Sequence, residues 1–261
     1  MPEMLEVEIY RRTAAASLGR RIVAVDASDA WLLKGGADAE MVVDALVGRS
    51  FVTDRRRGKL LLLDTSDGGP TLGLRFGMTG VLELDGVASI DGLEYSSHRR
   101  DPAWVRFSIH FEGGGALRLR DPRRLGGVEL DPDEERLGPD AADVTAAQLR
   151  AILDGSNVPL KARLMDQARL AGLGNLLTDE VLWRAGFDPA RAAGSLDQDQ
   201  VAALRRTMRS TLRVLGRRGG SHTGDLQQSR HRGGTCPADG ALLLRRTIGG
   251  RTTYSCPVHQ R

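Results

Sequence analysis

The sequence is poor in cysteine and has no long apolar run. Its 261 residues include two cysteines, too few for the disulfide framework of a small secreted domain. No apolar segment approaches the roughly 20 residues that a membrane-spanning helix needs, and the first residues lack the pattern of a signal peptide. We therefore expect a soluble, cytoplasmic chain with no membrane partner, long enough for one large domain or two smaller ones.

Lysine is scarce as well. The chain has only Lys34, Lys59 and Lys161, whereas lysine and arginine together number 37. Such a preference for arginine usually reflects genome composition and not function. A lysine retained against that preference is worth inspecting for a specific role.

The net charge of +3 conceals an uneven distribution of charge. Residues 129–154 carry eight acidic side chains against Arg136 and Arg150. Residues 201–261 carry twelve arginines against Asp225 and Asp239. A basic C-terminal quarter favours a polyanionic partner, and the alternative is a solvated charged face.

The first 130 residues predict one helix followed by short strands. Residues 4–18 are loosely amphipathic, and Gly19 closes this helix. Short strands are expected at residues 21–27, 59–63, 71–76, 81–84, 105–111 and 117–119. Residues 105–111 alternate apolar and polar side chains, as a half-buried strand does. We expect a β-sandwich or barrel-like domain over residues 1–130.

The remainder predicts a second, helical domain. Residues 131–144 are acidic and contain proline, which indicates a linker. Residues 145–220 have helical periodicity, and residues 221–261 form a loop-rich tail with both cysteines. The predicted fold class is α+β with two domains.

Helix starts in the second domain are predicted from capping residues. Thr145 can cap a helix that ends at Leu153, and Asn157 can cap the next, with Pro159 in its first turn. Ser195 and Gln198 match the capping-box spacing before a third helix. One apolar face of that helix is formed by Val201, Leu204, Met208, Leu212 and Leu215.

A glycine-rich turn, Ala171-Gly172-Leu173-Gly174-Asn175, lies between two helical runs within residues 158–189. The second run starts directly after the turn. The amides at a helix start, next to glycine backbone, make a ready anion site. The turn therefore predicts a contact with a nucleic-acid backbone, and the alternative is an ordinary corner whose glycines allow close packing.

The tail contains two short-spaced pairs of metal-ligand types. Cys236 and Asp239 form the first pair, and Cys256 and His259 form the second, as in a zinc ribbon. His231 is a possible substitute ligand, and a metal-free hairpin with two buried thiols is the alternative. Residues 247–253 would form the hairpin tip and present Arg251.

The N-terminus offers a nucleophile. Methionine before proline is generally removed, which would leave a secondary amine at Pro2 that can attack an aldehyde-level carbon and form an iminium. Glu3 lies beside it and could shuttle protons. Lys59 follows Arg55-Arg56-Arg57-Gly58 on a basic turn that enters a strand, where a phosphate contact or plain solvation is equally natural.

These segments together resemble the formamidopyrimidine-DNA glycosylase and endonuclease VIII family. The ordered motifs are Pro2-Glu3 with Glu6-Val7-Glu8, Gly58-Lys59, Gly77-Met78-Thr79-Gly80, Asp121-Pro122-Arg123-Arg124, the 171–175 turn with Asp179-Glu180, and residues 250–257. The resemblance implies a helix–two-turn–helix in the second domain and a zinc-ribbon-like β-hairpin in the tail. It covers nearly the whole chain.

The resemblance also implies an activity: excision of oxidised bases, followed by cleavage at the abasic site through β,δ-elimination. Pro2 would attack the sugar C1′ and form a Schiff base, and Glu3 would protonate the opening sugar or the leaving group. Lys59 would act in the β-elimination and contact phosphate. Arg251 would contact phosphate and assist the δ-elimination.

The implied partner is double-stranded DNA with a damaged base or an abasic site, bound by a monomer that is nucleoid-associated when it holds DNA. The damaged base must leave the stack to be reached. Its departure leaves a gap in the base stack. The family residues that fill this gap are matched here by Met78, Arg123 and Leu125. Lys161 and the Gly174-Asn175 turn match the residues that grip phosphates, and the implied cofactor is one structural Zn²⁺ held by Cys236, Asp239, Cys256 and His259.

The sequence departs from the family pattern at several positions. Leu5 stands where proline is usual, Leu125 stands where phenylalanine is usual, and Arg75-Phe76 replaces a histidine before the Gly-Met-Thr-Gly turn. Asp239 and His259 replace two cysteines, and residues 220–236 are short for a lesion-capping loop. These departures leave a second hypothesis, a catalytically weak or inactive DNA-binding paralogue that recognises abasic or damaged DNA. A third hypothesis is an RNA-binding module, because a similar helix–two-turn–helix occurs in a ribosomal protein.

Overall fold

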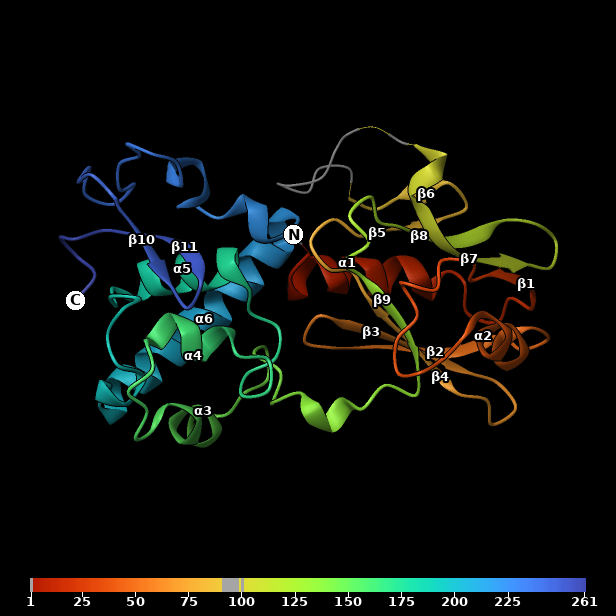
Figure 1. Cartoon of the computed structure of the whole chain (residues 1–261). Coiled ribbons are helices and arrows are strands. Elements are labelled where there is room, and N and C mark those ends of the chain that lie inside the picture. Colours follow the sequence, from red (N-terminus) through yellow and green to blue (C-terminus); the bar gives the residue numbers. More distant parts are fainter. Residues whose placement is uncertain (1, 91–98, 100) are drawn as a thin grey trace. The chain divides into compact units, whose positions relative to one another are not determined.

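The computed structural model describes residues 2–90, 99 and 101–261. The chain forms two compact units, Met1–Glu134 and Glu135–Arg261 (Figure 1). The division falls inside the acidic segment 131–144 that was expected to be a linker. Within the described part of the chain, no helix combines the length and the apolar character needed to cross a membrane.

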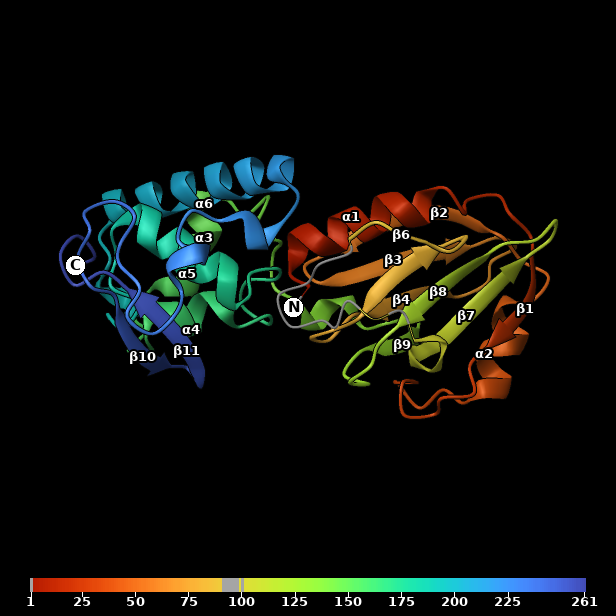
Figure 2. The same cartoon turned by 90° about the horizontal axis from the view of Figure 1, so that it is seen from above.

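The N-terminal unit is a β-sandwich with a leading helix, as the sequence predicted (Figure 2). Its elements are α1 (Met4–Ala15), β1 (Ile22–Asp26), α2 (Ala39–Leu46), β2 (Phe51–Arg57), β3 (Leu60–Thr65), β4 (Thr71–Arg75), β5 (Val81–Leu84), β6 (Val87–Ala88), β7 (Val105–Phe111), β8 (Ala116–Arg120) and β9 (Gly127–Leu130). One sheet has the order β1-β7-β8-β5-β6 and the other has the order β2-β3-β4-β9. All described pairings in both sheets are antiparallel.

Helix α1 packs against strands of both sheets, because it contacts β2, β3 and β5. Val7, Tyr10 and Ala14 have no exposed surface and belong to the same core as the strands. The Tyr10 ring lies 4.5 Å from the Phe76 ring, and its hydroxyl donates to the carbonyl oxygen of Gly80 at 3.1 Å. Burial raises the pKa of Tyr10, so this hydroxyl stays protonated. The helix is thereby fixed to the turn that contains Met78.

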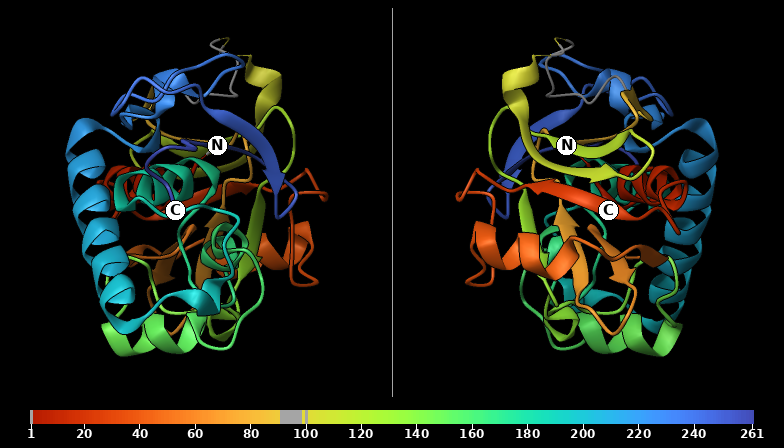
Figure 3. Two further views of the ribbon diagram at one scale, coloured as in Figure 1. Left: turned by 90° about the vertical axis from the view of Figure 1, so that its left-hand side faces the viewer. Right: turned by 90° about the vertical axis from the view of Figure 1, so that its right-hand side faces the viewer.

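The C-terminal unit combines helices with a β-hairpin, again as expected. Its elements are α3 (Ala146–Leu153), α4 (Leu160–Met165), α5 (Asn175–Ala185), α6 (Gln198–Arg218), β10 (Leu244–Ile248) and β11 (Arg251–Ser255). Figure 3 shows α6 running along one side of this unit, and α6 contacts both α3 and α5. Strand β11 packs on α5. Short 3-10 turns lie at Pro102–Trp104, Glu134–Arg136, Ala193–Ser195, Ser221–Thr223 and Gln227–Ser229.

One of the three predicted helix caps is confirmed and two are wrong. Thr145 caps α3 in a reciprocal box with Gln148. Helix α4 instead begins after Pro159, with no side-chain cap. Helix α6 is capped by Asp197 with Gln200, because the hydroxyl of Ser195 donates backwards to the carbonyl oxygen of Ala192.

The basic run Arg55–Arg57, which was expected to form a turn, belongs to strand β2. Arg57 pairs with Leu60, so the turn consists of Gly58 and Lys59 alone. Gly58 has φ +59°, a left-handed conformation that favours glycine. The turn therefore fixes the place of Lys59 between two paired strands. Helix α2 and strands β2, β6 and β9 had no counterpart among the predicted elements.

Candidate functional site

Pro2 and Glu3 lie at the start of α1, and both are buried. Glu3 has no exposed surface and forms a capping box with Glu6, in which the Glu3 amide donates to Glu6 Oε2 at 2.8 Å. The positive end of the helix dipole favours a carboxylate here. Pro2 follows Met1, which is outside the described residues. The local structure therefore holds a carboxyl group next to the predicted nucleophile.

An ionic network joins α1 to the strand that leads to Lys59. Glu8 accepts from Arg11 at 2.8 Å and lies 3.6 Å from Arg56, and Arg11 also pairs with Asp54 on β2. Burial alone would raise the pKa of Glu8, but the hydrogen bond and charge of Arg11, with the other arginines, lower it below its usual range. The network holds strand β2, which leads into the Lys59 turn, against helix α1.

Lys59 is half-buried on this turn. The guanidinium of Arg56 donates to the carbonyl oxygen of Gly58 at 2.7 Å, which fixes the turn from inside the unit. Pro2, Glu3 and Lys59 are thus carried by elements of one unit that ion pairs hold together. Such fixed side chains are what general acid–base and covalent chemistry requires.

The predicted gap-filling residues lie on two turns of the same unit. Met78 lies in the turn between β4 and β5 and is half-buried. Arg123 and Leu125 lie in the turn between β8 and β9, and Leu125 keeps 49% of its surface exposed. Leu125 is an exposed apolar side chain that directly follows two arginines, which makes it a suitable wedge for a base stack.

The glycine turn of the C-terminal unit leads directly into α5. Gly172 has φ +115°, and Gly174 is the N-cap. The side chain of Gln167 organises the turn, because it donates to the carbonyl oxygen of Leu173 at 2.9 Å and accepts from the amide of Gly172 at 3.0 Å. Asn175 is the first residue of α5, and within the described part of the chain its buried Oδ1 has no hydrogen-bond partner.

Lys161 does not lie at the surface of the glycine turn. Its side chain has no exposed surface, and its ammonium lies 2.7 Å from both Asp179 Oδ1 and Thr253 Oγ1. Asp179 also accepts from Arg230 at 2.9 Å. These internal contacts tie α4 and α5 to β11, and the phosphate contact of Lys161 stays a prediction.

The hairpin presents Arg251 as predicted. Ile248 pairs with Arg251, so Gly249 and Gly250 form a two-residue turn in which both have positive φ. Arg251 is exposed at the start of β11. A Cβ at Gly249 would lie 2.9 Å from the Cβ of Ala162, so the tip approaches α4 closely. This close approach fixes the tip of the hairpin against α4.

The four predicted metal ligands converge. One ligand atom from each of Cys236, Asp239, Cys256 and His259 lies within 4.8 Å of the others. Each cysteine lies in a tight turn, in which the amide two residues later points at its sulfur at 3.4 Å. His231, the possible substitute, is outside this cluster, and its Nδ1 lies 3.1 Å from the carbonyl oxygen of Arg232.

The surroundings of the cluster fit a divalent cation. His259 Nε2 lies 3.2 Å from the carbonyl oxygen of Trp183, a contact that orients the ring with Nδ1 toward the cluster. Nδ1 lies 2.8 Å from Asp239 Oδ2. The hydrogen bond from His259, with the amide of Ala241, lowers the pKa of Asp239, and burial raises the pKa of the Cys256 thiol. Four donors of these types suit a closed, structural zinc site.

Sequence reasoning missed Trp183, whose indole N–H points at Cys236 Sγ at 3.2 Å. It comes from α5, 53 residues earlier in the chain. No local pattern links the two residues, because their contact depends on how the tail folds back on α5. Gln167 was missed although its partners are local, and Asp121 was quoted only as part of a motif, with no role of its own.

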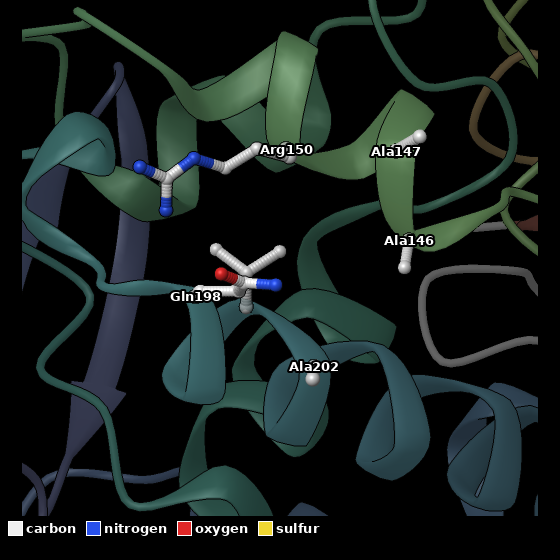
Figure 4. Close-up of a pocket in the computed structure, with 6 residues that line it drawn as sticks. Ala146, Ala147, Arg150, Gln198 and Ala202 are labelled. Atoms are coloured by element: carbon white, nitrogen blue, oxygen red, sulfur yellow. The ribbon is translucent and has the colours of Figure 1, made fainter.

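A hollow of about 490 Å³ lies between α3 and α6 (Figure 4). It is lined by Ala146, Ala147, Arg150, Gln198, Val201 and Ala202. None of these six residues is a carboxylate, thiol, imidazole or hydroxyl, so the hollow offers no acid, base or nucleophile. It is separate from every predicted site residue of the C-terminal unit.

Two family models match the chain. The formamidopyrimidine-DNA glycosylase N-terminal domain matches residues 1–128, and the formamidopyrimidine-DNA glycosylase H2TH domain matches residues 137–225. The formamidopyrimidine-DNA glycosylase of Paracoccus denitrificans is 33% identical over 289 residues, and that of Roseiflexus sp. is 31% identical over 284 residues. Each comparison covers 100% of both chains.

Solved structures agree with these relatives. A complex between the Lactococcus lactis Fpg and DNA containing an abasic site has a TM-score of 0.83 at 26% identity, and covers 100% of both chains. A complex of the Lactococcus lactis Fpg with DNA containing Fapy-dG has the same TM-score and identity, and covers 99% of this chain and 100% of that one.

Proposed function

The chain belongs to the formamidopyrimidine-DNA glycosylase family, and we propose that it removes oxidised bases from double-stranded DNA and cleaves the resulting abasic site. The observation that carries this proposal is the start of α1. There the buried carboxyl group of Glu3 lies next to Pro2, on a helix joined to the Lys59 turn by ion pairs. A DNA-binding module needs no such arrangement.

The proposed reaction starts at Pro2, whose amine is freed when Met1 is removed. Its lone pair forms a bond to the sugar C1′, and the glycosidic C1′–N bond breaks with its electron pair leaving on the base. Glu3 supplies the proton that the opening sugar or the departing base needs. The nitrogen then loses its proton, and its lone pair breaks the C1′–O4′ bond; the ring oxygen takes up a proton and stays on C4′ as a hydroxyl, which leaves an iminium Schiff base between Pro2 and C1′.

The Schiff base acts as an electron sink for strand cleavage. Removal of a C2′ proton expels the 3′ phosphate, and a second elimination expels the 5′ phosphate. We assign Lys59 to the first step and to a phosphate contact. We assign Arg251 to a phosphate contact and to the second step. Both side chains are cations, and Lys59 lies on a two-residue turn with fixed backbone while Arg251 directly follows one.

The remaining site residues are assigned to holding DNA. Gly174 and Asn175 begin α5 and would receive a phosphate at its positive end. Met78, Arg123 and Leu125 would fill the space that the flipped base leaves. Flipping a base out of the stack costs a few kcal/mol. The phosphate contacts would fix the position of the protein along the duplex while the wedge residues hold open the gap that the flipped base leaves.

The test is reductive trapping. The full chain is incubated with a duplex that contains an abasic site, in the presence of borohydride, and the adduct is mapped by peptide mass spectrometry. We expect one covalent adduct at Pro2. A short N-terminal extension turns the amine into an amide and should abolish the adduct, whereas the same extension after Arg261 should leave it intact.

Other outcomes of the trapping experiment are equally informative. An adduct at Lys59 would show that the nucleophile is assigned to the wrong amine. No adduct, together with tight binding of the abasic duplex, would favour the catalytically inactive paralogue. Tight binding of RNA alone would favour the RNA-binding module.

We further propose that Cys236, Asp239, Cys256 and His259 hold one structural Zn²⁺, whose charge would hold the two turns of the tail together. We expect one equivalent of zinc per chain by atomic absorption, and its loss in Cys256→Ser, because the ligand set then keeps a single sulfur. His231→Ala is the matched control and should keep its zinc. A folded wild-type chain that contains no zinc would contradict the assignment.

A further inference from the structure

The two turns with the proposed wedge residues are in direct backbone contact. A Cβ at Gly77 would lie 2.4 Å from the carbonyl carbon of Leu125. A Cβ at Gly126 would lie 2.7 Å from the carbonyl oxygen of Arg75. Neither position accepts a side chain without a shift of backbone, so the two turns have the close fit of a packed interior. They are nevertheless about 45 residues apart in sequence.

One buried carboxylate joins the two turns. Asp121 has no exposed surface, and its Oδ1 accepts from Thr79 Oγ1 at 2.6 Å and from the Arg123 amide at 3.2 Å. Its Oδ2 accepts from the amides of Leu125 and Gly126, both at 2.7 Å. Thr79 follows Met78, so a single side chain bonds to the neighbour of one wedge residue and to the backbone of the other two.

We propose that Asp121 is the positioning residue of the wedge, and that it couples the two turns so that Met78, Arg123 and Leu125 enter the duplex as one preformed unit. This inference rests on the proposed function. Asp121 itself touches no substrate in this proposal and acts through the turns that it holds. Hydrogen bonds to a buried carboxylate are stronger than neutral ones, and a preformed wedge avoids the entropy cost of ordering two loops during binding.

The outer side of the second turn is held as well. Arg124 adopts φ +54°, a conformation that is strained for a residue with a side chain. Its guanidinium pairs with Asp29, and its carbonyl oxygen accepts from the indole N–H of Trp31 at 3.1 Å. Arg106 donates to the carbonyl oxygen of Asp121 at 3.1 Å. These contacts fix the turn between its buried carboxylate and the β1–α2 segment.

The test is Thr79→Val, which removes the bond between the turns and keeps the shape of the side chain. Thr79→Ser restores the hydroxyl. Thr71→Val is the matched control, because Thr71 Oγ1 makes the same kind of 2.6 Å bond to Asp64 in the same unit, away from the wedge. Asp121→Asn is the stronger variant, provided that its melting temperature matches that of Thr71→Val.

Two readouts separate positioning from folding. The first is base release from a damaged duplex, compared with cleavage of an abasic site in a single strand, which has no gap to fill. The second is fluorescence of 2-aminopurine opposite an abasic analogue, which reports wedge insertion without catalysis. We expect Thr79→Val to lower base release and the insertion signal about 10-fold, with single-strand cleavage unchanged and full recovery in Thr79→Ser.

Equal losses on duplex and single strand would mean a purely structural role and would overturn the inference. No loss of insertion signal in Thr79→Val would overturn it too, as would a wild-type chain that gives no insertion signal. A wild-type chain that inserts but releases no base would instead contradict the proposed glycosylase, and the comparison of insertion signals would still decide the role of Asp121.

Discussion

Replacing Glu3 by glutamine should lower base release from a damaged duplex by about 10²–10⁴-fold, the usual contribution of a general acid or base. Cleavage of an abasic site that is already present should persist, because the amine of Pro2 still forms the Schiff base there. The amide oxygen of glutamine can still accept from the Glu6 amide, so the capping box at the start of α1 is kept. The substitution therefore removes the acid and spares the helix.

The measurement is single-turnover base release by chromatography, with abasic-site cleavage followed on gels in parallel. Asp197→Asn is a suitable control, since Asp197 caps α6 in the same type of reciprocal box but lies in the other unit. It should change neither rate. If Glu3→Gln released bases at the wild-type rate, Glu3 would not be the proton donor for base release, and loss of both activities together would place its proton on the opening sugar instead of the departing base.

The sequence predicted best those features that depend on nearby residues. Thr145 caps α3 because its hydroxyl and the amide of Gln148 are three residues apart. The prediction for α6 used the same rule but chose Ser195, two residues too early. The sequence offers two overlapping capping boxes with the same spacing, Ser195 with Gln198 and Asp197 with Gln200. The second one forms, because the hydroxyl of Ser195 already donates to the carbonyl oxygen of Ala192.

The ligand cluster was predictable for a similar reason. Each ligand pair spans a single tight turn, so the spacing within Cys236–Asp239 and within Cys256–His259 nearly determines its geometry. The role of Trp183 was not predictable, because it reaches the cluster from α5. Residues that support a site from a distant part of the chain leave no local pattern.

Lys161 has buried partners that the sequence pattern did not predict. Its position in the family motif suggested a phosphate contact. The structure places it 2.7 Å from Asp179, with Thr253 as a further partner. Whether a lysine faces solvent or the interior depends on where the acidic partner lies, and Asp179 is on the next helix along the chain. A spacing rule carries no information about that choice.

The same buried network predicts the largest loss of stability. Asp179→Ala would leave the ammonium of Lys161 and the guanidinium of Arg230 buried without their carboxylate. Removing one partner of a buried ion pair typically costs about 3–5 kcal/mol of unfolding free energy. The Tyr254 amide also points at Asp179, at 3.4 Å, so strand β11 should loosen together with the Arg251 tip.

Guanidinium unfolding of the full chain, with hydrogen exchange read out over residues 135–261, measures this loss. Asp225→Ala is the matched control, because Asp225 also bridges two arginines, Arg184 and Arg218, but is 45% exposed. A solvent-exposed bridge contributes at most about 1 kcal/mol. Equal losses in the two variants would show that burial adds nothing to the Asp179 pairs. A loss confined to Asp179→Ala, with faster exchange in β11, is the result expected if Lys161 and Asp179 hold the hairpin that presents Arg251.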